Sequence, residues 1–90
     1  MDDAVRLRGL QDATVYWRRW APDHADLIVE WVRVRYLLVD RGDNPPLLGS
    51  LLLDAGLDMS VRLACREHPE QVRDLLRVDI VRMIFLLEGA

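Results

Sequence analysis

The stretch that decides the fold runs from Pro69 to Gly89 and reads PEQVRDLLRVDIVRMIFLLEG. Its apolar residues recur at intervals of three and four positions, the spacing that places side chains on one face of an α-helix. The residues on that face are Val72, Leu75, Leu76, Ile80, Met83, Ile84 and Leu87. Pro69 fits the first turn of such a helix, where its missing N–H group leaves no bond unmade, and Gly89 is typical of a helix end. The pattern predicts one long helix with a core-facing side.

This expected helix is more apolar than contact with a single core requires. Apolar residues also fall outside the expected core face, at Val78, Val81 and Phe85. Large apolar side chains that gather on a surface are typical of protein-binding sites, so these three are candidate partner-binding residues. Two ion pairs at i,i+3 spacing are also expected along the helix, Asp74 with Arg77 and Asp79 with Arg82.

Upstream of this stretch, the same spacing predicts a helix over residues 3–20. Its expected core face is made of Leu7, Leu10, Ala13, Thr14, Trp17, Trp20 and Ala21. Pro22 ends the segment, because the residue before a proline avoids the helical region.

Residues 23–41 form the next expected helix, with Asp23 as its N-cap. The helical step runs through Ala25, Ile28, Trp31, Val32, Arg35 and Leu38. Residues 32–36 also alternate between apolar and charged side chains, so a strand over residues 27–39 is the alternative. We favour a helix, since the apolar run is too long for an average strand and no other segment offers a clear pairing partner.

The segment from Arg41 to Pro46 carries the clearest turn signals, with Gly42 suited to a left-handed helix end. Beyond it, a leucine-rich helix is expected over residues 45–55 and a short helix over residues 58–68. The sequence therefore predicts an all-α fold, a compact bundle of four to five helices that forms a single domain over residues 1–90.

The composition excludes several classes of protein. Hydrophobic residues make up 51% and charged residues 30% of the sequence, which is too apolar for a disordered chain. The net charge of −3 disfavours general nucleic-acid binding, because that affinity comes from neutralising phosphates. No uncharged apolar run reaches the roughly 18 residues of a membrane span, so we expect a cytoplasmic protein with no membrane partner. All 12 basic residues are arginine, which indicates GC-rich coding and a bacterial source.

No arrangement of side chains indicates catalysis. The candidate nucleophiles and bases are Ser50, Ser60, Cys65, His24 and His68, and none sits in a nucleophile elbow or a glycine-rich turn. Cys65 and His68 supply at most two metal ligands, whereas a zinc site needs three or four. We therefore expect no enzyme activity, no metal, no cofactor and no small-molecule substrate.

An aromatic and arginine cluster is the strongest local signal for binding. Residues 16–20 read YWRRW, and the next expected helix adds Arg33. If Trp17 and Trp20 face the core, their neighbours in this segment face outward, and Trp, Tyr and Arg are the residues that dominate binding hot spots. Two interpretations stay open, a solvated face around core tryptophans and a partner-binding surface. The candidate residues of that surface are Tyr16, Arg18, Arg19 and Arg33.

The second half of the sequence resembles a known family. LLLDAGLD at residues 51–58, VRDLL at 72–76 and LLEG at 86–89 are similar to segments of the bacterial effector-associated domains. Those domains are small helical adaptors, death-domain-like in their use, that join a sensor or protease to its effector in bacterial conflict systems. They do so by like-with-like contacts. The resemblance implies an adaptor role and self-association, and it assigns no role to a particular residue.

These observations predict a non-catalytic protein–protein interaction module, an adaptor or regulatory domain of a bacterial defence system. Its partner is expected to be another protein or a second copy in a homodimer. The first alternative is a small phage or mobile-element inhibitor of a nuclease or defence complex, because a compact chain without chemistry fits that role equally. The second alternative is a helical subunit of a ribonucleoprotein complex that contacts nucleic acid through its arginines.

Overall fold

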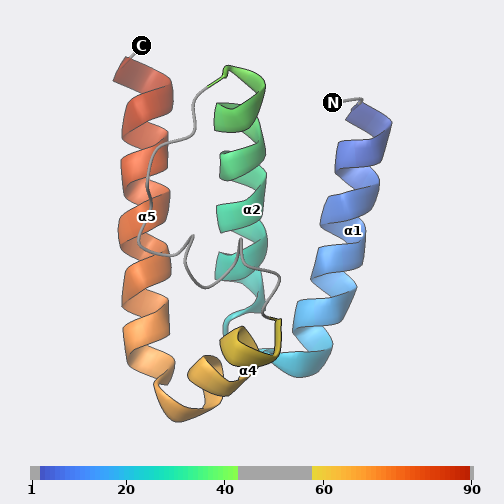
Figure 1. Cartoon of the computed structure of the whole chain (residues 1–90), viewed down its shortest axis with the longest axis vertical. Helices are drawn as coiled ribbons and strands as arrows, with labels where there is room; N and C mark the ends of the chain where they lie inside the picture. The colour runs from blue at the N-terminus through green and yellow to red at the C-terminus, as the bar shows by residue number, and fades with distance from the viewer. Residues whose placement is uncertain (1–2, 43–57, 90) are drawn as a thin grey trace.

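The structure is a computed structural model that describes residues 3–42 and 58–89. This part of the chain contains four α-helices and no strand (Figure 1). The helices are α1 (Asp3–Trp20), α2 (Ala25–Asp40), α4 (Asp58–Glu67) and α5 (Pro69–Gly89). The predicted all-α bundle is confirmed, and residues 27–39 are helix. The helix expected over residues 45–55 lies outside the described residues.

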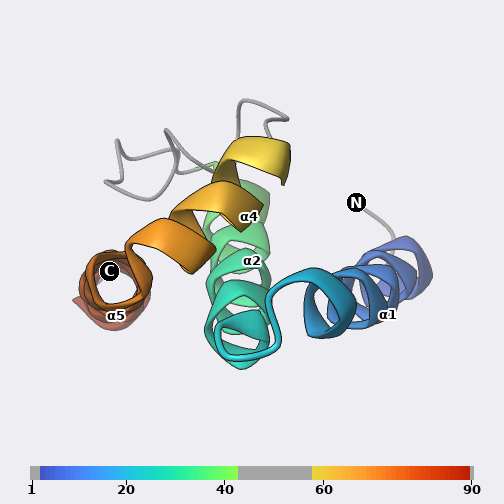
Figure 2. The same ribbon diagram turned by 90° about the horizontal axis from the view of Figure 1, so that it is seen from below.

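Helix α2 is the central element of the fold. It packs against α1 on one side and α5 on the other, as the two views in Figures 1 and 2 agree. Helix α1 runs antiparallel to α2, whereas α5 runs parallel to it (Figure 1). The short helix α4 packs against α5 and crosses one end of this row. None of the described helices is both long enough and apolar enough to cross a membrane.

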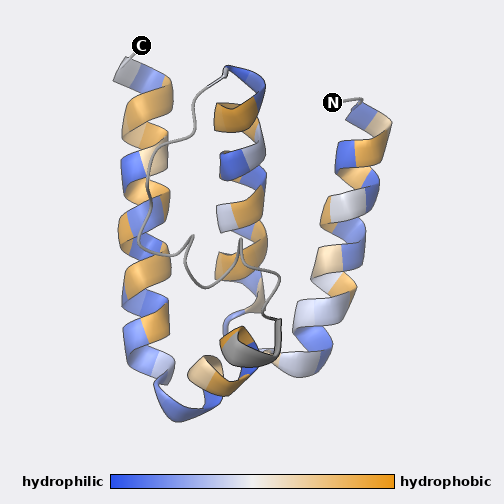
Figure 3. Cartoon of the chain, in the orientation of Figure 1, coloured by the Kyte–Doolittle hydropathy of each residue, from blue (hydrophilic) through white to orange (hydrophobic). Residues whose placement is uncertain are grey.

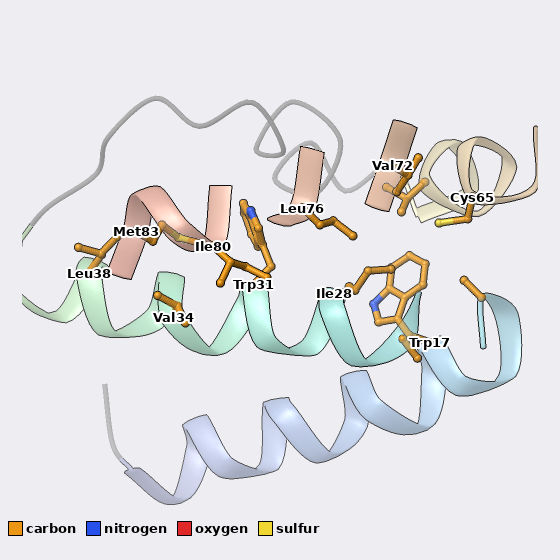
Figure 4. Packing of buried hydrophobic residues seen from close by; sticks show 13 residues of the cluster. Trp17, Ile28, Trp31, Val34, Leu38, Cys65, Val72, Leu76, Ile80 and Met83 are labelled. Carbon is orange, nitrogen blue, oxygen red and sulfur yellow. The ribbon is translucent and has the colours of Figure 1, made fainter. Parts of the chain in front are cut away.

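The core lies where α2 faces its neighbours. Its buried residues on α2 are Ala25, Ile28, Trp31, Val34 and Leu38. They meet a stripe on α5, one residue of α1 and two residues of α4 (Figure 4), namely Val72, Leu76, Ile80, Met83, Trp17, Val61 and Cys65. The predicted phase of both long helices is correct, but single positions differ. On α5, Ile84 was expected on the core face but exposes 36% of its surface, because it lies at the edge of the buried stripe. One position also differs on α2. Val34 is buried there, while Val32 and Arg35 are only half-buried.

The prediction for the first helix was wrong at two positions. Trp20 exposes 47% of its surface and Leu7 exposes 58%, although both were expected in the core. Among the described helices, α1 packs chiefly against α2, so it buries only a narrow stripe. Trp17 is the buried residue of α1.

A buried histidine holds one end of the bundle together. Helix α2 begins after His24 and not after the expected cap Asp23, and no side chain caps it. The His24 ring is buried, and its Nε2–H donates a hydrogen bond of 2.8 Å to the carbonyl oxygen of Pro69. The backbone N–H of His24 donates to Ala21 at 3.0 Å. The turn between α1 and α2 is thereby tied to the junction of α4 and α5.

Arginine side chains hold the opposite end. Arg6 near the start of α1 forms an ion pair with Asp40 at the end of α2. The Arg41 guanidinium donates to the carbonyl oxygens of Leu86 and Leu87, at 3.3 and 3.1 Å. Those carbonyls belong to the last turn of α5, where a positive charge is favourable. The C-terminal end of α2 thus anchors both of its neighbours.

The two ion pairs expected within the last helix do not form. Between described residues, the ion pairs are Asp3–Arg6, Arg6–Asp40, Arg8–Asp12 and Glu30–Arg33. Asp79 is instead buried, because it lies on the stripe of α5 that faces α2. Its carboxylate accepts a hydrogen bond of 3.2 Å from the indole N–H of Trp31. A polar link therefore crosses the apolar contact between the two helices.

Candidate protein-interaction surfaces

Helix α5 carries apolar side chains on the side that points away from the core. Val78 exposes 47% of its surface, Val81 66% and Phe85 73%. At 100° per residue these three positions lie opposite the buried stripe of the same helix. Figure 3 shows apolar residues along the whole length of α5. The prediction that these side chains lie outside the core is confirmed.

A shallow depression continues this exposed side toward the start of α5. It is lined by Gln71, Asp74, Leu75 and Val78, which are spaced as neighbours on one helix face. Leu75 and Val78 supply its apolar part, while Gln71 and Asp74 supply polar groups. We call the depression together with Val81, Arg82 and Phe85 the α5 outer face. It combines a hollow at one end with an exposed phenyl ring at the other.

A second surface lies where α4 meets the end of α1. The half-exposed indole of Trp20 lies within cation–π distance of two guanidinium groups. The guanidinium carbon of Arg62 is 4.3 Å from the ring centroid, and that of Arg19 is 5.1 Å away. Arg62 also lies 6.0 Å from the ring of Tyr16. These four residues form the Trp20 cluster, in which cation–π attraction holds α4 against α1.

The other candidate partner-binding residues predicted from the sequence differ in their exposure and contacts. Arg18 and Arg19 are exposed, as expected, but Tyr16 is half-buried and packs edge-on against Trp17 with ring centroids 4.9 Å apart. Arg33 is exposed on α2, where its Nε–H donates to Glu30 at 3.0 Å. That hydrogen bond lowers the pKa of the Glu30 carboxyl. Arg33 is thus engaged within its own helix.

Sequence reasoning missed two members of the Trp20 cluster. Helical periodicity assigned Trp20 to the core face, and no local signal distinguished Arg62 from the other arginines. The two side chains come from helices far apart in the sequence. Their contact is a property of the tertiary arrangement and has no signature within either segment.

Among the described residues that could carry chemistry, Cys65 and His24 are buried. Cys65 is buried, and burial raises the pKa of its thiol, which disfavours the reactive thiolate. His24 is engaged with the Pro69 carbonyl, whereas His68 is exposed. Across residues 3–42 and 58–89, no group of three or more His, Cys, Asp or Glu side chains is placed to hold a metal ion.

No family model matches this sequence, and neither the curated proteins nor the solved structures contain a match to it.

Proposed function

We propose that this chain is a non-catalytic protein–protein interaction module that binds its partner through the α5 outer face. The observation that carries the proposal is the position of Val78, Val81 and Phe85, exposed and opposite the core. Fully burying one such side chain contributes about 1.5–3 kcal/mol. A partner that covers all three gains several kcal/mol, and aromatic residues are enriched in interfaces.

The rest of α5 supports this role by holding the helix rigid. Its other side is packed into the core, and the buried Asp79 is bonded to Trp31 on α2. Arg41 holds its last turn. A binding face on an already ordered helix loses little conformational freedom when a partner docks, which favours affinity.

The biological setting is a narrower proposal on the same surface. The proposal of an adaptor or regulatory domain of a bacterial conflict system rests on a resemblance to the bacterial effector-associated domains. That resemblance lies in residues 51–58, 72–76 and 86–89. A phage or mobile-element inhibitor would use the same face against a nuclease or defence complex. Cytoplasmic location and bacterial source stay predictions from composition.

Site-specific photo-crosslinking tests the proposed surface. A photoreactive phenylalanine analogue replaces Phe85 in the full chain, which is then irradiated in its source cells. We expect a discrete adduct with another polypeptide, and Val81→Asp in the same chain should abolish it. The matched control carries the analogue at Gln11, which is exposed on α1. The proposal is wrong if position 85 yields no adduct beyond the level seen at position 11.

One observation supports a second candidate, a helical subunit of a ribonucleoprotein complex. In the Trp20 cluster, a half-exposed indole lies beside two guanidinium groups, an arrangement that suits base stacking and phosphate contact. The net charge of −3 weighs against it. Gel-shift assays with single-stranded RNA and DNA at two salt concentrations test it, since a phosphate-based contact must weaken as salt rises. Absence of salt-sensitive binding would remove this candidate.

A further inference from the structure

The α5 outer face is complementary to itself when it is reversed end to end. Three pairs of residues are spaced equally on the two sides of Val78. Leu75 and Val81 are three positions from it, Asp74 and Arg82 are four positions from it, and Gln71 and Phe85 are seven positions from it. Six of the seven lie on the side of α5 that faces away from the buried stripe, and Leu75 is half-buried at the edge of that side. The acidic Asp74 is thus matched by the basic Arg82 at the same distance on the other side of Val78. The polar Gln71 is matched in the same way by the apolar Phe85.

We propose that the partner of this face is α5 of a second copy of the chain, packed antiparallel across a two-fold axis at Val78. The inference rests on the proposed function, because it names the occupant of the same surface. Such an axis makes an isologous contact, in which each residue meets the partner's residue at the equal and opposite distance. Phe85 of one copy then faces the depression beside Gln71 of the other, Leu75 faces Val81, and Asp74 faces Arg82.

Charge decides between the two ways of pairing the helices. In a parallel, in-register pair, Asp74 would face Asp74 and Arg82 would face Arg82, and like charges at an interface cost affinity. The phenyl rings would also face each other and leave both depressions empty. In the antiparallel pair, Asp74 of each copy faces Arg82 of the other, so two symmetric attractions replace the two repulsions. Each Phe85 then faces a depression on the other copy.

The position of α5 in the molecule leaves room for this contact. The helix lies at one edge of the row formed with α2 and α1 (Figure 2), and Phe85 lies on the side of α5 opposite its buried stripe. A contact made by one helix from each copy is expected near the lower limit of specific interfaces, about 1,200 Å² in total. We therefore expect a dissociation constant in the micromolar range, roughly 1–100 μM.

Sedimentation equilibrium of the full chain across that concentration range tests the dimer. The wild-type mass should rise from 10.4 kDa toward twice that value. Asp74→Arg and Arg82→Asp should each weaken dimerisation about tenfold or more, because each creates like-charge contacts across the axis. The double variant, D74R/R82D, should recover wild-type dimerisation. Arg8→Asp, an exposed change on α1, is the charge control and should leave the mass curve unchanged.

Three results would overturn the proposal: a wild-type monomer at every concentration, single variants that dimerise like the wild type, or a double variant that keeps its helical circular dichroism but stays monomeric. The proposed function fails separately. A monomer whose position 85 still crosslinks to a different polypeptide rejects the dimer and leaves the interaction surface in place. A dimer that Phe85→Asp does not affect rejects the α5 contact between copies, and crosslinking at position 85 then decides the proposed function by itself.

Discussion

At the scale of single residues, the most informative side chain is a carboxylate in the core. Asp79 has no exposed surface, and its oxygen accepts a hydrogen bond from the Trp31 indole. A buried polar group without a partner costs free energy, so the two side chains constrain each other. Their bond joins one position of α2 to one position of α5 across the apolar contact between the two helices.

Removing the Asp79 carboxylate should destabilise the fold. Asp79→Ala leaves the Trp31 N–H without this acceptor and opens a cavity, so we expect a loss of about 2–4 kcal/mol in the free energy of unfolding. Asp79→Asn keeps an oxygen acceptor of similar shape and should cost clearly less. Urea denaturation followed by circular dichroism measures both. A loss below about 0.5 kcal/mol for Asp79→Ala would show that the bond adds no stability.

At the scale of helices, α5 differs from its neighbours in carrying apolar residues on two opposite sides. The core side could be predicted from sequence, since its spacing matches the helical repeat. The other side could be predicted only as an excess of apolar residues. The structure turned that excess into a surface by showing that no other described helix covers Val78, Val81 and Phe85.

Truncations on the two sides of α5 should therefore have unequal effects on the free energy of unfolding. Met83→Ala removes a completely buried side chain and should cost about 2–5 kcal/mol in the free energy of unfolding. Phe85→Ala should change it by no more than about 0.5 kcal/mol, although the side chain is larger. Urea denaturation at a protein concentration well below the dissociation constant, where the proposed dimer is largely dissociated, makes the comparison. Equal losses would show that Phe85 is covered in the folded chain.

Helix α1 illustrates where periodicity fails. The spacing of Leu7, Trp17 and Trp20 predicts a common buried face, yet only Trp17 of these three is buried. A helix at the edge of the row has one main neighbour, so a narrower arc of its surface reaches the core. Sequence periodicity reports that a helix has an apolar side, but not how much of that side another helix covers.

At the scale of the whole molecule, the part of the chain that the structure describes forms a row of three long helices fastened at both ends. His24 ties the turn between α1 and α2 to the carbonyl of Pro69, where α4 passes into α5. Arg6 and Arg41 join the other end through Asp40 and the last turn of α5. These polar links connect residues more than 30 positions apart in the sequence. They therefore hold together segments that have no contact through neighbouring residues of the chain.

The two histidines provide a matched test of this closure. His24→Ala removes a buried ring and leaves the Pro69 carbonyl without its donor, so we expect a loss of about 2–3 kcal/mol in the free energy of unfolding. His68→Ala changes an exposed side chain and should stay within about 0.5 kcal/mol. Thermal and urea unfolding measure both variants. Similar effects at the two positions would mean that the His24 link contributes little.

The sequence by itself determined the class of fold, because turn residues and the three-to-four spacing of apolar side chains are local properties that each helix carries alone. It also determined which side of α5 enters the core. Only the tertiary structure decided that Trp20 meets Arg62, that Asp79 is buried against Trp31, and that His24 reaches Pro69. Each of these contacts joins segments far apart in the chain, so its geometry exists only after the helices have packed.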